Sequence, residues 1–390
     1  MTGHTVTTGG RSRIIRLAWK PESMTVEWAN GDSSEYASLW LRDNVSEDRD
    51  AHSGQRLLDI ADLPADPRIR SAVADATSVR VEWENEERAA AFDLDWLAAH
   101  GSHSGPQRPE LATKLWLHGA SLDPLRDFAW ASLPEARARP TVRAAWLTRL
   151  LQEGIAFLRG APADEEALLK AVSMVGQVSE TNYGRVFDVR SVAQPENLAY
   201  SDLGLGLHTD NPYREPVPGF QALHAVVTSP DGGESLFADG FALAEHLRVT
   251  APDAFAQLTR TPVPFQYRSK EAELYAERPL IQLSCHGTVV AVHYNSRSIA
   301  PLRLSARDTV QFYSAYRRFA ALLRLPQFQL KYRLRDGNIV VFDNQRTLHG
   351  RTSFSSAKYP RHLRGCYLTR DSVYCEAALL RRQLAGEASA

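Results

Sequence analysis

The sequence predicts a mostly β protein with inserted helices, preceded by a small β-rich module. Short runs that alternate apolar and polar residues recur in both halves of the chain, which is typical of strands. Fewer runs carry apolar residues at helical spacing, and they lie between the predicted strands. No glycine-rich phosphate loop follows a strand, which argues against a βαβ Rossmann arrangement.

Length and composition indicate a globular protein of more than one domain. The chain has 390 residues, of which 44% are hydrophobic and 23% charged. With 45 basic and 46 acidic residues its net charge is −1, so the footprint of a nucleic-acid-binding protein is absent. No window offers eighteen continuous apolar residues, and no membrane partner is expected.

Cysteine content and the N-terminus predict a cytoplasmic protein. The chain has three cysteines, Cys285, Cys366 and Cys375, which are too few for a disulfide framework or a cysteine-rich zinc site. The first fifteen residues lack the apolar stretch of a signal peptide.

The first predicted domain is a small β-rich unit over residues 12–105. Residues 24–28 form an alternating run that is followed by Asn30-Gly31, a hairpin signal. Residues 79–83 alternate in the same way, and residues 92–97 look like a short closing element. Gly, Ser and Pro are frequent in residues 100–109, which we expect to be a loop or linker.

The second predicted domain covers residues 125–385 and carries the longer β core. Helical spacing predicts helices over 141–153, 164–175 and 305–323. The clearest predicted strands are 156–160, 221–227, 288–294 and 338–342.

Three residues of the second domain form a candidate metal centre. His208 and Asp210 are two positions apart and point to one face of an extended backbone, and His349 follows much later. Two imidazoles and one carboxylate form the face that suits non-haem Fe(II), because three coordination positions stay open. Zinc accepts the same ligands, and both residues of a lone His-x-Asp pair are more often ordinary turn residues.

An arginine after the last histidine makes the combination more specific. Arg361 lies twelve positions beyond His349, at the start of a predicted strand. Its guanidinium is suited to bind a carboxylate through two parallel hydrogen bonds, although a lone arginine is usually a surface charge. The ordered set of His-x-Asp, Asp-Asn-x-Arg-x-x-His-Gly and Arg is much rarer than any of its members.

At this point the sequence resembles the γ-butyrobetaine hydroxylase branch of the taurine-dioxygenase-like Fe(II)/2-oxoglutarate oxygenases, over nearly its whole length. The motif that resembles the N-terminal domain of that branch is Trp40-Leu-Arg-Asp-Asn44. The motifs that resemble its catalytic domain are Asn197-Leu-Ala-Tyr200, Leu207-His-Thr-Asp210, Gly232-Gly-Glu-Ser235, Asp239-Gly-Phe241, Phe342-Asp-Asn344 and Arg361-His-Leu-x-Gly-x-Tyr367.

The resemblance implies a double-stranded β-helix, or jelly-roll, catalytic domain. It places Fe(II) on His208, Asp210 and His349, and 2-oxoglutarate on Arg361. Ser235 matches a hydroxyl residue that helps hold the co-substrate carboxylate, and an ordinary strand serine is the equal alternative. The family also implies O₂ as co-substrate and a homodimer.

One feature departs from the family. Its N-terminal domain usually has a Cys/His zinc site just after the Trp-Leu-Arg-Asp-Asn motif. Here residues 45–54 contain no cysteine and only one histidine, His52. We therefore expect no structural zinc, and we expect apolar packing to hold this domain together.

The substrate class comes from the same resemblance. The positions that match the family's trimethylammonium cage are Tyr183, Phe187, Tyr200 and Tyr367. Ring faces attract a quaternary ammonium group, which donates no hydrogen bond, so aromatic residues suit it. Taken without the motifs, the same four residues would be interpreted as core aromatics.

The opposite end of the substrate is predicted to be anionic. The candidate residues at this end are Asn211 and Arg297, and Asn197 and Asn295 are further candidate substrate-binding residues. An added guanidinium at Arg297 suits a phosphonate, and the combination resembles the [2-(trimethylamino)ethyl]phosphonate dioxygenases. An internal ion pair of Arg297 is the alternative.

The predicted function is hydroxylation of a small trimethylammonium compound with release of succinate and CO₂. The substrate expected first is [2-(trimethylamino)ethyl]phosphonate, converted to its 1-hydroxy product, and the alternative is γ-butyrobetaine, converted to carnitine. Two other classes stay open, a cupin-like binding protein without activity and a zinc hydrolase.

Overall fold

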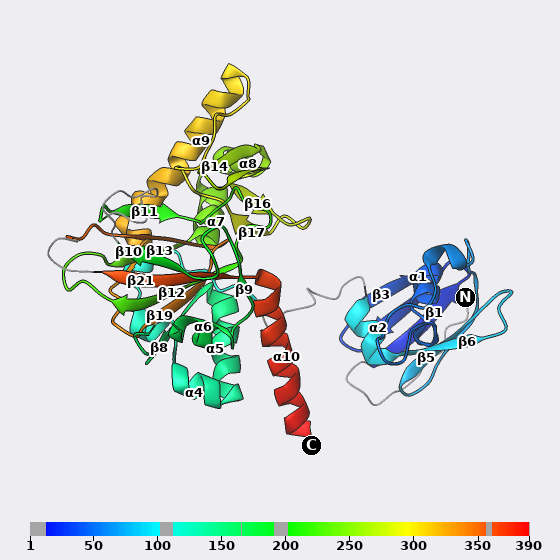
Figure 1. Ribbon diagram of the computed structural model, residues 1–390. Coiled ribbons are helices and arrows are strands. Elements are labelled where there is room, and N and C mark those ends of the chain that lie inside the picture. Colours follow the sequence, from blue (N-terminus) through cyan, green and yellow to red (C-terminus); the bar gives the residue numbers. More distant parts are fainter. Residues whose placement is uncertain (1–12, 102–111, 165, 191–201, 356–360, 390) are drawn as a thin grey trace. The chain divides into compact units, whose positions relative to one another are not determined.

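The computed structural model describes residues 13–101, 112–164, 166–190, 202–355 and 361–389 (Figure 1). The chain divides into two compact units, Met1–Glu110 and Leu111–Ala390. The narrower boundaries drawn from the sequence, 12–105 and 125–385, remain predictions. In the described ranges no helix combines the length and the apolar character that crossing a membrane requires.

Over residues 13–101, the first unit consists of two three-stranded antiparallel sheets with two short α-helices. One sheet has the order β1-β2-β3 and the other β4-β5-β6. Their apolar faces share a core that contains Met24, Val81 and Trp83, all at most 1% exposed. The elements are β1 (Ile14–Lys20), β2 (Ser23–Trp28), β3 (Ser33–Ala37), α1 (Ser38–Asp43), β4 (Ile69–Ala74), β5 (Ser78–Trp83), β6 (Ala89–Asp93) and α2 (Leu94–His100).

A buried group of ion pairs adds to the apolar packing of this unit. Arg42 lies 2.6 Å from Asp48 and 2.8 Å from Glu86, and all three side chains are at most 16% exposed. Arg88 also bonds to Asp48. These contacts attach the segment after α1 to the end of the second sheet, so apolar packing alone, as expected from the sequence, is an incomplete account of this domain.

The second unit is built on two sheets that pack face to face as a jelly roll. The main sheet has the order β10-β21-β12-β19-β8-β7, with β9 paired to β21, and the smaller sheet has the order β11-β20-β13-β18. Their strands are β7 (Ala129–Ser132), β8 (Ile155–Arg159), β9 (Val178–Ser179), β10 (Phe187–Arg190), β11 (Leu205–His208), β12 (Phe220–Val227), β13 (Ser235–Asp239), β18 (Leu330–Tyr332), β19 (Ile339–Asp343), β20 (Thr347–Arg351) and β21 (His362–Leu368).

Side chains that alternate along the strands of the main sheet belong to two different apolar layers, one on each face of the sheet. On β19, Val340 and Phe342 point toward the smaller sheet and pack with Phe237 of β13. Ile339 and Val341 point the other way, into a layer formed with helices. Because successive strand residues face opposite sides, one strand supplies both cores.

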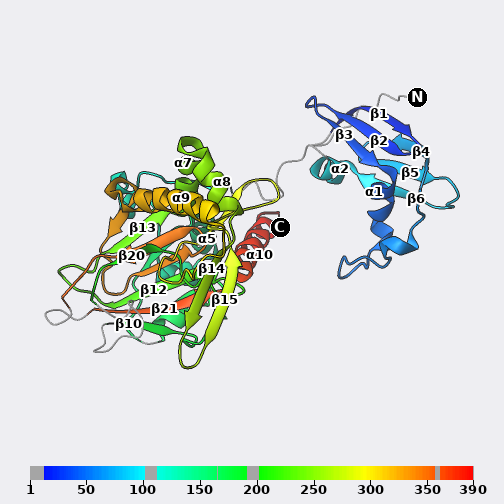
Figure 2. The same cartoon turned by 90° about the horizontal axis from the view of Figure 1, so that it is seen from above.

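Helices cover the outer faces of the two sheets. Figure 1 shows α5, α6 and α10 against the main sheet, and Figure 2 shows α7, α8 and α9 grouped near β13 and β20. The helices are α3 (Pro124–Asp127), α4 (Leu133–Ala138), α5 (Pro140–Glu153), α6 (Ala167–Val172), α7 (Gly240–Thr250), α8 (Pro252–Arg260), α9 (Ala306–Arg324) and α10 (Arg370–Ser389). Two hairpins complete the unit, β14 (Val263–Arg268) with β15 (Glu273–Arg278) and β16 (Ile281–Leu283) with β17 (Val289–Val292).

The predicted fold class, mostly β with inserted helices and a jelly-roll catalytic domain, is confirmed. The strands predicted at 221–227 and 338–342 and the helices predicted at 141–153 and 305–323 are present, with bounds that differ by at most one residue. The helix predicted at 164–175 spans only Ala167–Val172, and the strand predicted at 288–294 spans only Val289–Val292. The His293 amide still donates to Leu280, next to β16, whereas the Tyr294 amide donates to the Thr209 hydroxyl and so leaves the β16–β17 ladder.

Candidate active site

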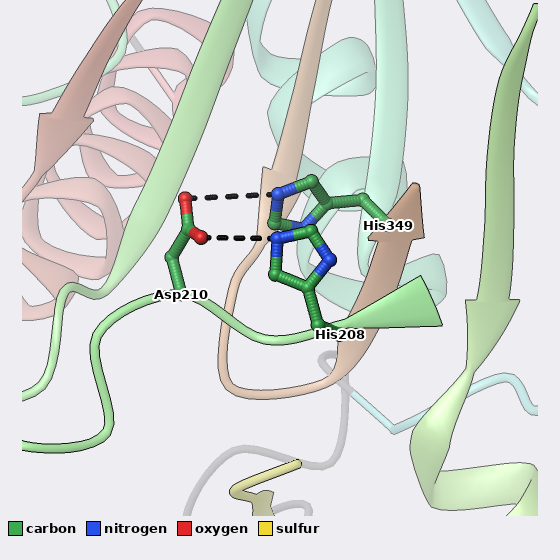
Figure 3. Close-up of side chains that lie close together, drawn as sticks. All are labelled: His208, Asp210 and His349. Carbon is green, nitrogen blue, oxygen red and sulfur yellow. Dashed lines mark ion pairs between the residues drawn. The ribbon is translucent and has the colours of Figure 1, made fainter. Parts of the chain in front are cut away.

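Two histidines and one aspartate meet at one end of the jelly roll. The ligand atoms of His208, Asp210 and His349 all lie within 4.8 Å of one another (Figure 3). Nε2 of His208 is 3.2 Å from Asp210 Oδ1, and Nε2 of His349 is 3.6 Å from Asp210 Oδ2. The structure thus brings together the three residues that the sequence selected as metal ligands.

Strand pairing places the two imidazoles side by side. His208 ends β11 and His349 lies on β20, and the two are register partners in the smaller sheet. Their ring centroids are 4.4 Å apart. The ladder is close here because residue 350 is glycine: a Cβ at Gly350 would lie 2.4 Å from the carbonyl oxygen of Leu205.

Asp210 lies on a turn that is fixed from two sides. The side-chain amide of Asn344 accepts a hydrogen bond from the backbone N–H of Asp210 at 2.7 Å and donates one to the backbone carbonyl oxygen of Asp210 at 3.1 Å. On the other side, the backbone N–H of Thr209 donates to the backbone carbonyl oxygen of Tyr294 at 2.8 Å, and the backbone N–H of Tyr294 donates to the Thr209 hydroxyl at 2.9 Å. These contacts aim the carboxylate at the two histidines.

The protonation states of His208 and Asp210 favour metal binding at this site. Nδ1 of His208 is 2.9 Å from the carbonyl oxygen of Gly206, which only accepts, so Nδ1 carries the proton and the lone pair of Nε2 faces Asp210. Burial, helped by the charge of His349, lowers the pKa of His208 to about 4. Burial opposes ionisation of Asp210, but the two imidazoles still hold its pKa well below its usual range. At neutral pH the set offers a neutral imidazole and a carboxylate, the donor chemistry of a facial Fe(II) site.

A cavity leads from the histidines to two buried arginines. It is lined by Val189, Leu205, His208, Gln221, Leu223, Ser235, Phe237, His349, Gly350, Arg351, Arg361 and Leu363. Arg361 is 8% and Arg351 5% exposed. Burial, together with the charge of Arg351, lowers the pKa of Arg361 to about 10, so both side chains are cationic at neutral pH.

Glycine allows Arg361 to lie deep in this cavity. Its Nε donates to the carbonyl oxygen of Gly233 at 3.2 Å. A Cβ at Gly233, whose φ is +66°, would lie 2.8 Å from Arg361 Cδ. Ser235 lines the same cavity and is the register partner of Arg351. The sequence analysis missed Arg351, which follows the His-Gly motif directly.

A chain of hydrogen bonds leads from Asp210 to buried tyrosines. The Tyr367 hydroxyl donates to Asp210 Oδ2 at 2.8 Å, and the Asn211 amide donates to the Tyr367 oxygen at 3.2 Å. Tyr213 in turn donates to Asn211 at 2.7 Å, and its hydroxyl is 3.5 Å from that of Tyr183. Asn211 adopts φ of +52°, an uncommon backbone conformation that asparagine tolerates.

Aromatic side chains gather beside this chain of hydrogen bonds. The ring centroids of Phe187 and Tyr367 are 5.0 Å apart. Residue 365 must be small here, because a Cβ on Gly365 would lie 2.3 Å from the Phe187 ring. Tyr267 stacks on Tyr213 at 5.2 Å and meets Tyr183 edge-on at 6.1 Å. The sequence analysis missed Tyr213 and Tyr267. Tyr213 directly follows Pro212 near the metal motif, whereas no motif marks Tyr267.

The other residues predicted to bind the substrate differ in their contacts. The Asn295 amide is used within the fold: it donates to the Thr209 carbonyl at 3.1 Å and accepts from the Arg297 amide at 3.3 Å. Among the described residues, the Arg297 guanidinium has no hydrogen bond and no ion pair. Arg297 is exposed, and partial desolvation of its guanidinium lowers its pKa, while the charge of Asp210 acts in the opposite direction. Asn197 and Tyr200 lie outside the described residues.

Two family models match the chain. The model of the taurine catabolism dioxygenase TauD, TfdA family matches residues 124–367. The model of the N-terminal domain of γ-butyrobetaine hydroxylase-like proteins matches residues 15–98.

Several curated proteins are similar over almost their full length. A γ-butyrobetaine dioxygenase of Pseudomonas sp. is 33% identical, over 95% of this chain and 97% of that protein. A trimethyllysine dioxygenase of Meyerozyma guilliermondii is 27% identical, over 94% and 96%. The human γ-butyrobetaine dioxygenase is 28% identical, over 93% and 95%.

Proposed function

The chain belongs to the TauD/TfdA family of Fe(II)/2-oxoglutarate dioxygenases, and from this premise we propose that it hydroxylates a small trimethylammonium compound bearing an anionic group. The observation that carries the proposal is the convergence of the His208–Asp210–His349 set with a cavity that ends in buried arginines.

In this proposal His208, Asp210 and His349 hold Fe(II). The carboxylate would offset part of its charge, and the three ligands would leave one face free for other ligands. Fe(II) bound there supplies the oxidative chemistry, in which O₂ and 2-oxoglutarate give succinate and CO₂ while the substrate is hydroxylated. The protein residues hold the reactants in place and exclude water.

Arg361 and Ser235 bind the distal carboxylate of 2-oxoglutarate. Arg361 is a buried cation at one end of the cavity, and the metal ligands line the same cavity. A dicarboxylate that chelates the metal with one end thus meets a guanidinium at the other, where charge-assisted hydrogen bonds are strongest. Ser235 adds a hydroxyl donor on the wall of the cavity.

The aromatic residues bind the trimethylammonium group. Tyr183, Phe187 and Tyr367 are joined here by Tyr213 and Tyr267, which contact them or one another. Tyr367 presents its ring to Phe187 and its hydroxyl to Asp210, so a cation beside the ring lies near the metal site. Tyr200 belongs to this proposal through the sequence motif alone.

Two anions are candidates for the other end of the substrate. The names of the similar proteins favour γ-butyrobetaine, a carboxylate, over the phosphonate that the sequence analysis put first. The second candidate is [2-(trimethylamino)ethyl]phosphonate. Among the described residues the Arg297 guanidinium has no partner, and a phosphonate dianion with three oxygens can accept more of the hydrogen bonds that this guanidinium donates than a carboxylate can. Asn211 and Asn197 complete the proposed set of substrate-binding residues.

Anaerobic reconstitution tests the reaction class. We expect Fe(II) and 2-oxoglutarate to produce a metal-to-ligand charge-transfer band, and admission of O₂ with substrate to produce succinate. A protein that shows neither result is a cupin-like binding protein or a hydrolase, and the proposal fails. His349→Ala serves as the control that lacks one ligand.

Succinate formation with the two candidate substrates tests the anion. Higher turnover with γ-butyrobetaine identifies the carboxylate, and higher turnover with the phosphonate identifies the second candidate. Arg297→Ala is expected to reduce turnover of the phosphonate far more than that of γ-butyrobetaine, and an equal loss with both would remove Arg297 from anion recognition. We further expect a homodimer, which sedimentation of the purified protein tests.

A further inference from the structure

Gln221 of β12 is a buried amide without a hydrogen-bond partner. The residue is 2% exposed, and its Oε1 contacts neither solvent nor any donor. Among the described residues, neither atom of the amide has a hydrogen-bond partner. Buried amides are nearly always hydrogen-bonded, because an unmet polar group costs free energy, so this exception calls for a ligand.

The register of the main sheet places Gln221 at the metal end of the cavity. Its partner on β19 is Phe342, whose ring centroid is 4.8 Å from that of His349. Its partner on β21 is Tyr367, whose hydroxyl bonds to Asp210. Directly opposed residues of antiparallel strands present their side chains to the same face, so Gln221 lies between two residues that contact metal ligands.

The same amide lines the cavity that ends at Arg361. Next along the inner face of β12 is Leu223, which also lines the cavity, whereas Phe220 and Ala222 belong to the layer packed on the helices. An unpartnered amide on an otherwise apolar wall is suited to fix the orientation of one bound polar molecule.

We propose that the Gln221 amide is a hydrogen-bond donor to the metal-chelating end of bound 2-oxoglutarate. This inference rests on the proposed function and adds a contact at the end of the co-substrate opposite Arg361. The 1-carboxylate and the 2-oxo group offer only acceptors, so the amide nitrogen is the atom that binds them. The amide nitrogen gains a partner when the co-substrate binds, while the buried Oε1 stays without a donor in both the empty and the loaded protein.

Gln221→Met tests the proposal, because methionine keeps the length of the side chain and removes the amide. We expect the dissociation constant of the co-substrate, titrated anaerobically on the Fe(II) protein, to rise about tenfold, the effect of one hydrogen bond to a charged group. The maximum of the charge-transfer band is expected to shift. Fe(II) affinity is expected to stay unchanged.

Thermal unfolding without metal or co-substrate separates this role from a structural one. A structural amide would lower the midpoint when removed, whereas the orphaned amide of Gln221 predicts an equal or higher midpoint for Gln221→Met. Gln257→Met is the matched control, since Gln257 is also buried but is bonded to Thr261 at 2.9 Å. We expect that variant to lose stability and to keep the band and the affinity for 2-oxoglutarate.

A second variant distinguishes donor from acceptor. Gln221→Glu keeps the shape but presents an anion, so it is expected to bind 2-oxoglutarate more weakly than Gln221→Met does. An unchanged dissociation constant and an unchanged band in Gln221→Met overturn the inference while the parent protein still shows its band. A parent protein without any band overturns the proposed function itself.

Discussion

The hydroxyl of Tyr367 donates a hydrogen bond of 2.8 Å to the carboxylate of Asp210, so one tyrosine connects the aromatic cluster to the candidate metal centre. The ring of the same residue lies 5.0 Å from Phe187. Outer hydrogen bonds of this kind orient a ligating carboxylate and tune its affinity for metal.

Tyr367→Phe separates the two roles, because it removes the hydroxyl and keeps the ring. We expect Fe(II) affinity to fall about tenfold or more, since the carboxylate loses the bond that orients it. Competition with a fluorescent chelator measures the affinity. Tyr313→Phe, on the exposed side of α9, is the control, and equal affinity in both variants would show that the hydroxyl does not support the ligand set.

Gly365→Ala is expected to disturb the aromatic cluster most, because the added Cβ overlaps the Phe187 ring more closely than Leu223, which lies at 3.0 Å and lines the co-substrate cavity. The added Cβ would lie 2.3 Å from the Phe187 ring, which must move away from Tyr367. Loss of one aromatic face weakens binding of a quaternary ammonium group, and we expect the Michaelis constant for the trimethylammonium substrate to rise about tenfold. The Michaelis constant for 2-oxoglutarate is expected to change little.

Gly206→Ala is the matched control, because a Cβ at that strand glycine has nothing within 4 Å. If both alanine variants keep the parent protein's Michaelis constant for the trimethylammonium substrate, Phe187 does not contribute to its binding.

Arg42→Met is expected to destabilise the N-terminal unit by about 3 kcal/mol, because it leaves the buried carboxylate of Glu86 without its cation and Asp48 with Arg88 alone. Hydrogen exchange of the amides of β5 and β6 in the full chain measures the loss. Arg16→Met removes a pair whose side chains are half exposed, and about 0.5 kcal/mol is the expected cost there. Similar losses in the two variants would mean that the Arg42 contacts add little to stability.

His293 predicts a dependence of stability on pH. Burial, with the charges of Arg278 and Arg370, lowers its pKa to about 3, so the folded protein holds it neutral. The unfolded chain binds a proton near the ordinary pKa of histidine, about 6.5, so its contribution to stability is complete above that pH and declines as pH falls toward 3.

His293→Gln removes this effect. In chelator-treated protein, we expect the slope of the unfolding free energy against pH between 4 and 6 to decrease by about 1 kcal/mol per pH unit. Denaturant titrations at several pH values measure the slope, and an unchanged slope would mean that His293 takes up no proton on unfolding. The exposed His118→Gln is the control.

The sequence predicted the parts of this molecule that depend on local pattern or on spacing within a motif. His208, Asp210 and His349 were selected by their motifs, and the structure brings them within 4.8 Å. Strong alternation or an apolar run predicted β2, β5, β8, β12 and β19, and helical spacing predicted α5 and α9.

Two of the residues that were missed, Gln221 and Tyr267, reach the site only through tertiary pairing. Gln221 becomes notable only when β12 lies between β19 and β21, which places its amide between Phe342 and Tyr367. Tyr267 is on β14, far along the chain from Tyr213, and its stacking depends on how that hairpin packs. The signal for Gln221 in the sequence was its place in the mostly apolar run that begins at Phe220.

Recognition of a quaternary ammonium group is the central claim, and the uncharged isostere of the substrate tests it most directly. The measurement is succinate formation with γ-butyrobetaine and with its analogue in which carbon replaces the nitrogen. The aromatic cluster predicts strong stimulation by the charged compound and little by the isostere, which has the same shape but no charge for the rings to attract. Equal stimulation by the two compounds would contradict the account.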